Sequence, residues 1–573
     1  MRMWPYFRET FVGLPSLLRP TFLRSGQTYT WSDLRADSIA GFTVAMIQIP
    51  QSMALALIAG LPAVYGLYAS LFGFIASLWG SSRQLSTGPV AIVSFLTLTS
   101  LIPLAPPGSP EYLGLAATLA FLVGLIYLLI GLFRLGFIFQ LVPHSVVFGF
   151  SSAAAVIIII TQIPSLLGIG LPQHDLAFET VANILRMLPA LSLPTLVVSV
   201  CATVFLLFSR RLPDVFPAAL VVLGGAVLVS YLFSIGSYGV TLVGAVPQSL
   251  PSFTFPWFEA ETFVILIPKA ALIVLVGFVG AHASAKIAAR RTREHLDTDQ
   301  ELTGQGLANI VTSFFRGFPL GGSFTRTAVN VAAGGRTAIS AVVTALMTVL
   351  ALLYLAPLFT YLPKAVLAAI VIASAIPLID IARLRAMYRV SATDGFVAFL
   401  TFFIAFVLRP DDAIFIGIVV ALMLFIRQTV WGPHVTEIGV DRDLQILRGD
   451  IEEPSVDTFP GVAIARIGMA VYYANATHIV GELDKLIAGH VIRERAPVKT
   501  LVLDMAGVNL IDVTAIEVLE EYFTSLRERG IAVCTIYMRR SVRGALARVV
   551  NFPSFKMFQN IAQMRHALWL AHR

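Results

Sequence analysis

Apolar stretches, each close to the length of a membrane-spanning helix, recur along most of the chain. They begin near residue 39 and end near residue 428. A helix needs about 20 mostly apolar residues to cross the hydrocarbon core of a bilayer, so the pattern predicts a polytopic helical membrane protein. Spans are expected near 39–59, 113–133, 143–167, 193–208, 217–233, 262–285, 302–315, 338–356, 364–379, 393–408 and 412–427, with a further span ending near Arg83.

Two short polar stretches interrupt this pattern, one in each half of the chain. Residues 86–89 read Ser-Thr-Gly-Pro, and residues 321–330 hold a glycine pair, several hydroxyls and Arg326. Non-helical backbone is tolerated at membrane depth only where protein buries it or where it lines a watery cavity. Ser and Thr favour helix N-termini, and Pro89 suits the first turn of a helix. Each stretch therefore predicts a helix that begins inside the membrane and offers its N–H groups and positive dipole end to an anion.

Three residues near these breaks have a functional and a structural interpretation. Arg326 would cost about 2.5–3.5 kcal/mol against lipid, so it faces either an anion cavity or a structural partner such as a carboxylate or backbone carbonyls. Gln51 follows Pro50 in mid-span, and it either lines a polar cavity or only accompanies a kink. Gly88 either approaches a ligand or allows close helix packing.

The order of the spans predicts an internal symmetry. Counting the two broken segments gives about 14 spans, of which the third and the tenth are broken. Each is third in a half of seven, and an odd number of spans inverts one half relative to the other, as in many secondary transporters. An even total returns both termini to the cytoplasm. Most basic clusters then fall on the cytoplasmic side, with Arg409 as an exception.

The chain becomes ordinary in composition after about residue 435. Strands are expected at 462–466, 500–504 and 531–536, with helices at about 475–490 and 513–528 and another after 541. This alternation is typical of a small α/β domain. The expected organisation is therefore an N-terminal cytoplasmic segment (1–37), a transmembrane domain (38–430) and a cytoplasmic α/β domain (435–573).

Composition supports the membrane interpretation and excludes several classes of function. Of 573 residues, 57% are hydrophobic and 13% charged, and the mean hydropathy is +0.82. The net charge of +7 reflects cytoplasmic arginines rather than a nucleic-acid partner. Cys201 and Cys534 form no metal or disulfide pattern. No nucleotide loop, metal cluster or nucleophile–base motif is present, so neither an enzyme nor a cofactor is expected.

Several motifs together resemble the SulP anion transporter family, which includes prestin and bacterial sulfate permeases. The matching stretches are IPQSMA at 49–54, LPAVYGLY at 61–68, TGPVA at 87–91 and GSFTRTAVN at 322–330, and LDMAGVNLIDVTA at 503–515 resembles a STAS domain. The resemblance implies a uracil-transporter-like fold of 7+7 inverted repeats, a core domain that moves against a gate domain, and a homodimer.

The resemblance also implies an anion site between the N-termini of the third and tenth helices, near the first. Carried onto this sequence, the substrate-binding residues are Gln51, Leu55, Gly88, Val90, Ala91, Ser323, Phe324, Thr325 and Arg326. Many bacterial members carry a glutamate in the eighth helix that is thought to serve proton coupling, and this chain has Gly280 there. His282 is then the candidate coupling residue.

The function expected from these observations is a secondary transporter in the cell (inner) membrane. Its substrate is a small inorganic or carboxylate anion, such as sulfate, bicarbonate or chloride, carried by elevator-like alternating access. Co-transport of a proton or sodium ion stays open. Two alternatives are an anion channel or membrane motor, and an anion sensor that signals through the STAS domain.

Overall fold

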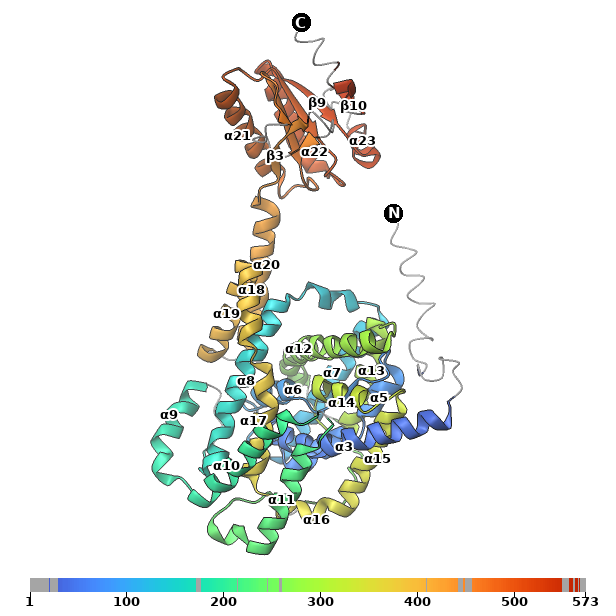
Figure 1. Cartoon of the computed structure of the whole chain (residues 1–573), viewed down its shortest axis with the longest axis vertical. Coiled ribbons are helices and arrows are strands. Elements are labelled where there is room, and N and C mark those ends of the chain that lie inside the picture. Colours follow the sequence, from blue (N-terminus) through green and yellow to red (C-terminus); the bar gives the residue numbers. More distant parts are fainter. Residues whose placement is uncertain are drawn as a thin grey trace. The chain divides into compact units, whose positions relative to one another are not determined.

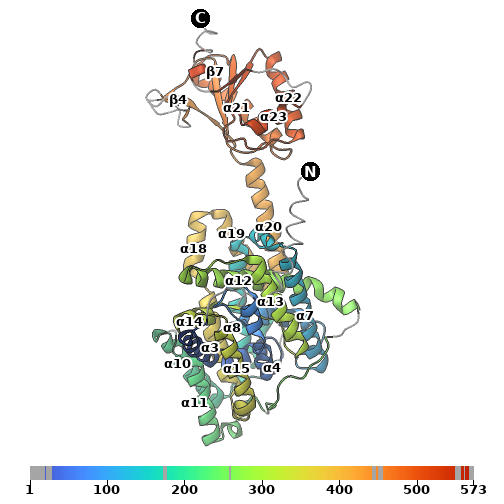
Figure 2. The same ribbon diagram turned by 90° about the vertical axis from the view of Figure 1, so that its right-hand side faces the viewer.

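The computed structural model describes residues 20, 29–171, 177–213, 215–244, 246–256, 260–408, 410–441, 447–448, 456–548, 556–559, 562–564 and 566. Most of the predicted N-terminal segment and Arg409 therefore lie outside the described residues. The chain divides into two compact units, Met1–Ala421 and Leu422–Arg573, whose elements are labelled in Figures 1 and 2.

The first unit is helical and contains the predicted succession of apolar segments. Eight of the described helices are long and apolar enough to cross a bilayer. In chain order the segments are α3 (Trp31–Ile58), α4 with α5 (Ala63–Ser70, Gly73–Trp79), β1 with α6 (Ser86–Gly88, Ala91–Leu101), α7 (Pro110–Leu132), α8 (His144–Leu167), α10 (Leu193–Phe208), α11 (Ala218–Phe233), α12 (Ala260–Thr292), α13 (Thr298–Phe314), β2 with α14 (Gly321–Ser323, Phe324–Ala332), α15 with α16 (Ile339–Leu350, Ala356–Phe359), α17 (Lys364–Ala375), α19 (Ala392–Val407) and α20 (Pro410–Trp431). The predicted fold of 14 spans with broken third and tenth segments is confirmed.

The first span differs from the prediction at its start. It begins at Trp31 rather than at Ile39, because Thr30 and Asp33 form a capping box in which each side chain bonds the other's backbone N–H. Pro50 does not divide the span, since α3 continues through it. Figure 1 shows α3 beside α15, and the two helices pack together.

Other differences concern short helices. The second span is divided into α4 and α5. Two helices between spans, α9 (Ala177–Met187) and α18 (Ile381–Val390), were not predicted, because each is too short and too polar on one face to resemble a span. Close packing explains one glycine in this region: a Cβ on Gly66 would lie 1.9 Å from the Ser52 carbonyl oxygen, so α4 lies directly against α3.

The second unit contains the predicted α/β domain. Its main sheet has the order β10-β9-β8-β7-β3, from Lys556–Phe558, Ala532–Ile536, Thr500–Asp504, Val462–Ile467 and Val435–Glu437. The first four strands are parallel and β3 is antiparallel. The three predicted strands are present. The edge strands β3 and β10 and the small sheet of β4–β6 (Gly439–Asp441, Leu447–Arg448, Val456–Asp457) were not predicted, since each is too short for a clear alternating pattern.

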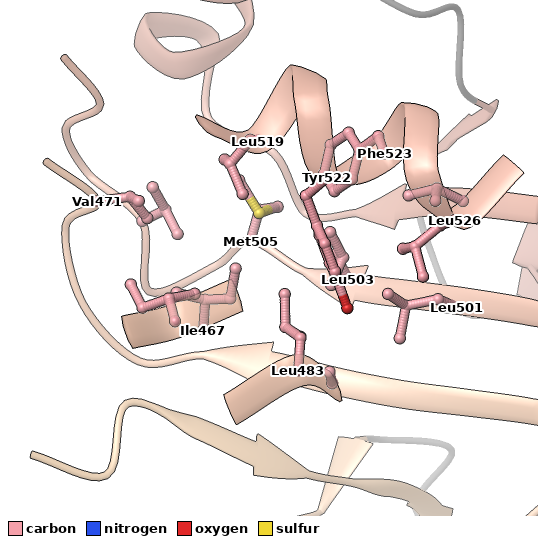
Figure 3. Close-up of a cluster of buried hydrophobic side chains, with 14 of the residues drawn as sticks. Ile467, Val471, Leu483, Leu501, Leu503, Met505, Leu519, Tyr522, Phe523 and Leu526 are labelled. Carbon is pink, nitrogen blue, oxygen red and sulfur yellow. The ribbon is translucent and has the colours of Figure 1, made fainter. Parts of the chain in front are cut away.

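Three helices cover one face of this sheet: α21 (Ala476–Glu494), α22 (Val513–Glu528) and α23 (Arg540–Leu546). Alternate strand residues such as Ala465, Leu501 and Leu503 point into the same apolar cluster as residues of these helices. Figure 3 shows Leu483 of α21 and Leu519 of α22 in that cluster.

Tyr522 gives this core a polar anchor that can be tested. Its hydroxyl donates a hydrogen bond to Asp484 (3.1 Å), and burial together with the Asp484 charge raises the pKa of Tyr522 above its usual range. Tyr522→Phe is expected to lower the free energy of unfolding by about 1 kcal/mol. Because the folded-state pKa is raised, the tyrosine's contribution is present below pH 10 and declines above it. Hydrogen exchange of residues 476–536 in the full chain, from pH 7 to 11, measures both effects. Equal stability of the two proteins at pH 7 would contradict the prediction.

Candidate functional site

The two broken segments meet through their extended stretches. Strands β1 and β2 pair antiparallel, with Ser86 opposite Ser323, Thr87 opposite Gly322 and Gly88 opposite Gly321. The pairing satisfies backbone groups that would otherwise be exposed at membrane depth. Each strand leads directly into a short helix, α6 or α14. The N-termini of both helices therefore lie beside the paired strands β1 and β2.

The two helix N-termini differ in how they are capped. Ser323 is the N-cap of α14, and its hydroxyl accepts a hydrogen bond from the Arg326 backbone N–H (3.4 Å). The N-cap of α6 is Val90, which provides no side-chain acceptor. The predicted place of Pro89 in the first turn is wrong, because α6 begins at Ala91 and Pro89 precedes the cap. The first N–H groups of α6 have no side-chain cap and can serve a bound anion.

Arg326 joins three elements at this point. Its side chain is fully buried. Nη1 donates to the Gln51 side-chain oxygen (3.1 Å) and to the Pro89 carbonyl (3.0 Å), and Nε donates to the Ser86 hydroxyl (3.3 Å). Within the described chain no carboxylate forms an ion pair with Arg326. The guanidinium therefore keeps an uncompensated positive charge while its partners hold it in place.

One nitrogen of Arg326 has no hydrogen-bond partner among the described residues. Nη2 is buried and unpaired. It lies against Gly88, where an added Cβ would be only 3.2 Å away. A buried guanidinium N–H without an acceptor is costly, and an anion would supply the missing acceptor.

A cavity of about 150 Å³ lies over the helix N-termini. Seven of the predicted substrate-binding residues line it: Gln51, Val90, Ala91, Ser323, Phe324, Thr325 and Arg326. Gly88 is not part of the lining, although it lies beside Arg326. Leu55 is also outside the lining and is 1% exposed, because it packs within the protein one turn beyond Gln51.

The other lining residues of the cavity come from α12 and α17, which the predicted set of substrate-binding residues omitted. Gly277, Gly280 and Ser284 of α12 line it, as do Ser374 and Leu378 at the end of α17. Apart from Gly280, which the family resemblance singled out as the position of a glutamate in many bacterial members, these small or apolar residues carried no signal in the sequence. His282, the candidate coupling residue, is not part of the lining; its ring stacks on Phe278 instead (5.5 Å between centroids).

Three polar residues on α13, which we call the α13 ladder, support the paired strands β1 and β2. Glu301, Gln305 and Asn309 are spaced four residues apart, so they share one face of the helix. The Glu301 carboxylate accepts hydrogen bonds from the backbone N–H groups of Ser81 and Ser82 (both 3.0 Å). These bonds hold the chain just before β1.

The other two residues of the α13 ladder, Gln305 and Asn309, hold the strands themselves. Gln305 donates to the Thr87 hydroxyl (2.8 Å) in β1. Asn309 accepts from the Leu320 N–H (2.8 Å), immediately before β2. None of the three ladder residues was predicted to support the site, although their four-residue spacing within an apolar segment was a usable signal.

Among the residues that the structure describes, no group of three or more His, Cys, Asp or Glu side chains could hold a metal ion. The site is built from helix ends, one guanidinium and neutral side chains. That set can bind and release an anion, and it includes no nucleophile–base pair.

Comparisons with known proteins identify both units. Residues 34–401 match the Sulfate permease family and residues 453–564 match the STAS domain. The chain is 32% identical over 537 residues to Sulfate transporter 4.1, chloroplastic, of Arabidopsis thaliana, covering 91% of this chain and 78% of that protein. It is 31% identical over 468 residues to human Solute carrier family 26 member 6, covering 77% of this chain and 61% of that protein.

Two solved structures resemble the chain in fold. One is the structure of SLC26A9, with a TM-score of 0.86 and 21% identity, covering 100% of this chain and 96% of that one. The other is the transmembrane domain of the cyanobacterial bicarbonate transporter BicA, with a TM-score of 0.60 and 25% identity, covering 69% of this chain and 98% of that one.

Proposed function

The chain belongs to the sulfate permease family, and from that premise we propose that it carries a small anion through the membrane by elevator-like alternating access. The anion binds between the N-termini of α6 and α14. One observation carries the proposal: two helix N-termini and the buried Arg326 guanidinium adjoin one cavity, and an Nη2–H of that guanidinium lacks an acceptor. With about +0.5 charge from each helix end and the charge of the guanidinium, the empty site carries about +2. A monovalent anion halves that charge, and a divalent anion such as sulfate brings the site near neutrality.

The composition of the cavity wall supports an elevator. Gln51, both helix N-termini and α12 hold the anion from one side, and only the end of α17 closes the other. Since β1, β2 and the α13 ladder tie the binding elements together, they move as one body. Displacement of that body along α17 carries the anion without breaking the site.

Transport into liposomes tests the proposal. The full chain, purified and reconstituted, is given labelled sulfate, bicarbonate, chloride and a dicarboxylate, with pH and sodium gradients imposed separately. We expect saturable uptake of at least one anion, accelerated by the same anion on the opposite side. Unitary currents would favour a channel, and voltage-dependent capacitance without flux would favour a motor.

Further parts of the proposal concern assembly and orientation. We place the protein in the cell (inner) membrane as a homodimer with both termini cytoplasmic. Basic residues at 210–211, 286–293 and 383–389 support the orientation. Signalling through the STAS domain is the second candidate, and normal uptake after deletion of 435–573 would leave room for it.

Gly280 offers a direct test of charge at the site. An added Cβ there meets no atom within 4 Å, so Gly280→Glu places a carboxylate at the cavity without a clash. Like charges about 8 Å apart repel by about 2 kcal/mol at an effective dielectric constant near 20. We therefore expect at least a ten-fold rise in KM at pH 8, relieved as the carboxyl is protonated at lower pH. Gly280→Gln is the matched control and is expected to show no such pH dependence. Equal KM values for the two variants at pH 8 would contradict the prediction.

A further inference from the structure

A second cavity lies in the first unit, at the other end of α17. Its volume is about 300 Å³, twice that of the first. It lies among the ends of α3 and α8 and the starts of α10 and α17, and the last two helices both pack against α8. Figure 1 shows α8, α10 and α17 as neighbours. The polar residues that line it are Thr161, Gln162, Ser165, Thr180, Thr195, Thr241 and Lys364.

The described lining of this cavity carries a positive charge. Lys364 is the single charged residue among its described lining residues. No described residue forms an ion pair or a side-chain hydrogen bond with its ammonium group, which is exposed. An exposed lysine with no acidic neighbour among the described lining residues is a point charge available to an anion.

The last carbonyls of α3 and α8 at this cavity are already hydrogen-bonded, so the starts of α10 and α17 contribute most of the helix-end charge. Helix α10 begins here after its Ser192 cap, and α17 begins here without a side-chain cap, so both positive dipole ends lie at the cavity. The C-terminal carbonyls of α8 are occupied by α10: Ser199 donates to Leu166 (2.7 Å) and the Ser192 N–H donates to Leu167 (3.0 Å). The Thr161 and Thr195 hydroxyls already donate to the Ile158 carbonyl and the Ser192 hydroxyl, so Lys364 and the helix starts are the groups that attract an oxyanion or halide here.

The two cavities lie at different depths along the same helix. Lys364 lines the second cavity and Ser374 lines the first, and a rise of 1.5 Å per residue separates these positions by about 15 Å. Helix α3 contributes to both, through Gln51 to the first and Leu57 to the second. Between them, α3 packs against α17, and the intervening Ala368 and Ala369 are buried.

We infer that the second cavity is a capture site for the transported anion on the side of the membrane where the loop 234–261 lies. Thr241 of that loop lines the cavity, and its backbone carbonyl accepts a hydrogen bond from the Lys364 backbone N–H (3.0 Å). The inference rests on the proposed function. Lys364 binds a small oxyanion or halide there. Displacement along α17 of the body that contains α3, α6, α12 and α14 then brings the Arg326 site to the membrane depth of Lys364.

Sided transport assays test this inference. In right-side-out and everted membrane vesicles, Lys364→Gln is expected to raise KM about ten-fold for anion supplied from the loop side. KM from the opposite side and kcat from the loop side are expected to stay within two-fold. Because detailed balance fixes the ratio of kcat/KM in the two directions, kcat for movement toward the loop side is expected to fall about ten-fold. Lys364→Arg should restore the low KM, because it keeps the charge. The matched control is Arg316→Gln, which removes an exposed cation that bonds Thr254 of the same loop but lies outside the cavity lining.

The outcomes separate this inference from the proposed function. Absence of anion flux in the wild-type chain would refute the proposed function itself. Wild-type flux with an unchanged or symmetrically changed KM in Lys364→Gln would overturn the capture site alone. A second readout keeps Lys364: Thr241→Cys, at another lining position, is made in a Cys201→Ser, Cys534→Ser background. Substrate anion should slow its modification by an anionic thiol reagent more than by a cationic one, and equal slowing would also overturn the inference.

Discussion

Arg326→Gln is expected to reduce kcat/KM for anion uptake by about 100-fold, the largest loss for any single substitution at the site. Removing a charged hydrogen-bond partner from a buried anion costs about 3 kcal/mol, and each 1.4 kcal/mol is a factor of ten. The glutamine keeps some polar contact with Gln51 and Pro89 but carries no charge. Initial rates in proteoliposomes, over a range of anion concentrations, measure the loss.

The expected result depends on charge and on geometry, and two further variants separate them. Arg326→Lys keeps the charge but cannot reach Gln51, Pro89 and Ser86 at once, so we expect an intermediate loss. Arg316→Gln removes an exposed arginine outside the cavity and should transport as the wild type does. If Arg326→Gln transports within three-fold of the wild type, the guanidinium does not bind the anion.

Glu301→Ala is expected to have the largest effect on stability. The substitution leaves the buried Ser82 N–H, the part-buried Ser81 N–H and one N–H of the Gln305 amide without their Glu301 acceptor, and each orphaned buried group costs about 1–3 kcal/mol. A loss of about 3 kcal/mol or more should prevent accumulation of folded protein. Thermal unfolding in detergent and the yield after size-exclusion chromatography provide the measurement.

Glu301→Gln separates the acceptor role of this residue from its charge. Its amide oxygen can still accept from the two serine N–H groups, so we expect folded protein with a smaller loss of stability. If Glu301→Ala is as stable as Glu301→Gln, the ladder on α13 does not hold the segment before β1.

The fold was predictable because its strongest signals are long-range and repetitive. Span length, the even count and the two broken segments follow from the bilayer and from backbone hydrogen bonding. The exact start of a helix and the effect of a proline inside it were less predictable. A single capping box moves the start of α3 to Trp31, and neighbouring helices allow Pro50 to remain inside it.

The candidate site was predictable only where polar residues break an apolar pattern. Arg326, Gln51 and the hydroxyls at 323–325 have that property, and all line the cavity or lie at its edge. Gly280 and Ser374 lack that property, because a small residue in an apolar helix gives the same sequence pattern whether it faces a cavity or a neighbouring helix. His282 is polar yet packs on Phe278, since polarity alone does not determine which way a helix face turns.

The pairing of β1 with β2 constrains how the protein can be made. Gly88 has its partner in Gly321, so the first broken segment leaves the ribosome long before the strand that completes its backbone hydrogen bonds exists. During that interval its polar backbone has to be sheltered by the insertion machinery, by water or by an interim partner. Truncated nascent chains that end before residue 321 should therefore be retained by the translocon or degraded, and chains that extend past 332 should be released into the bilayer.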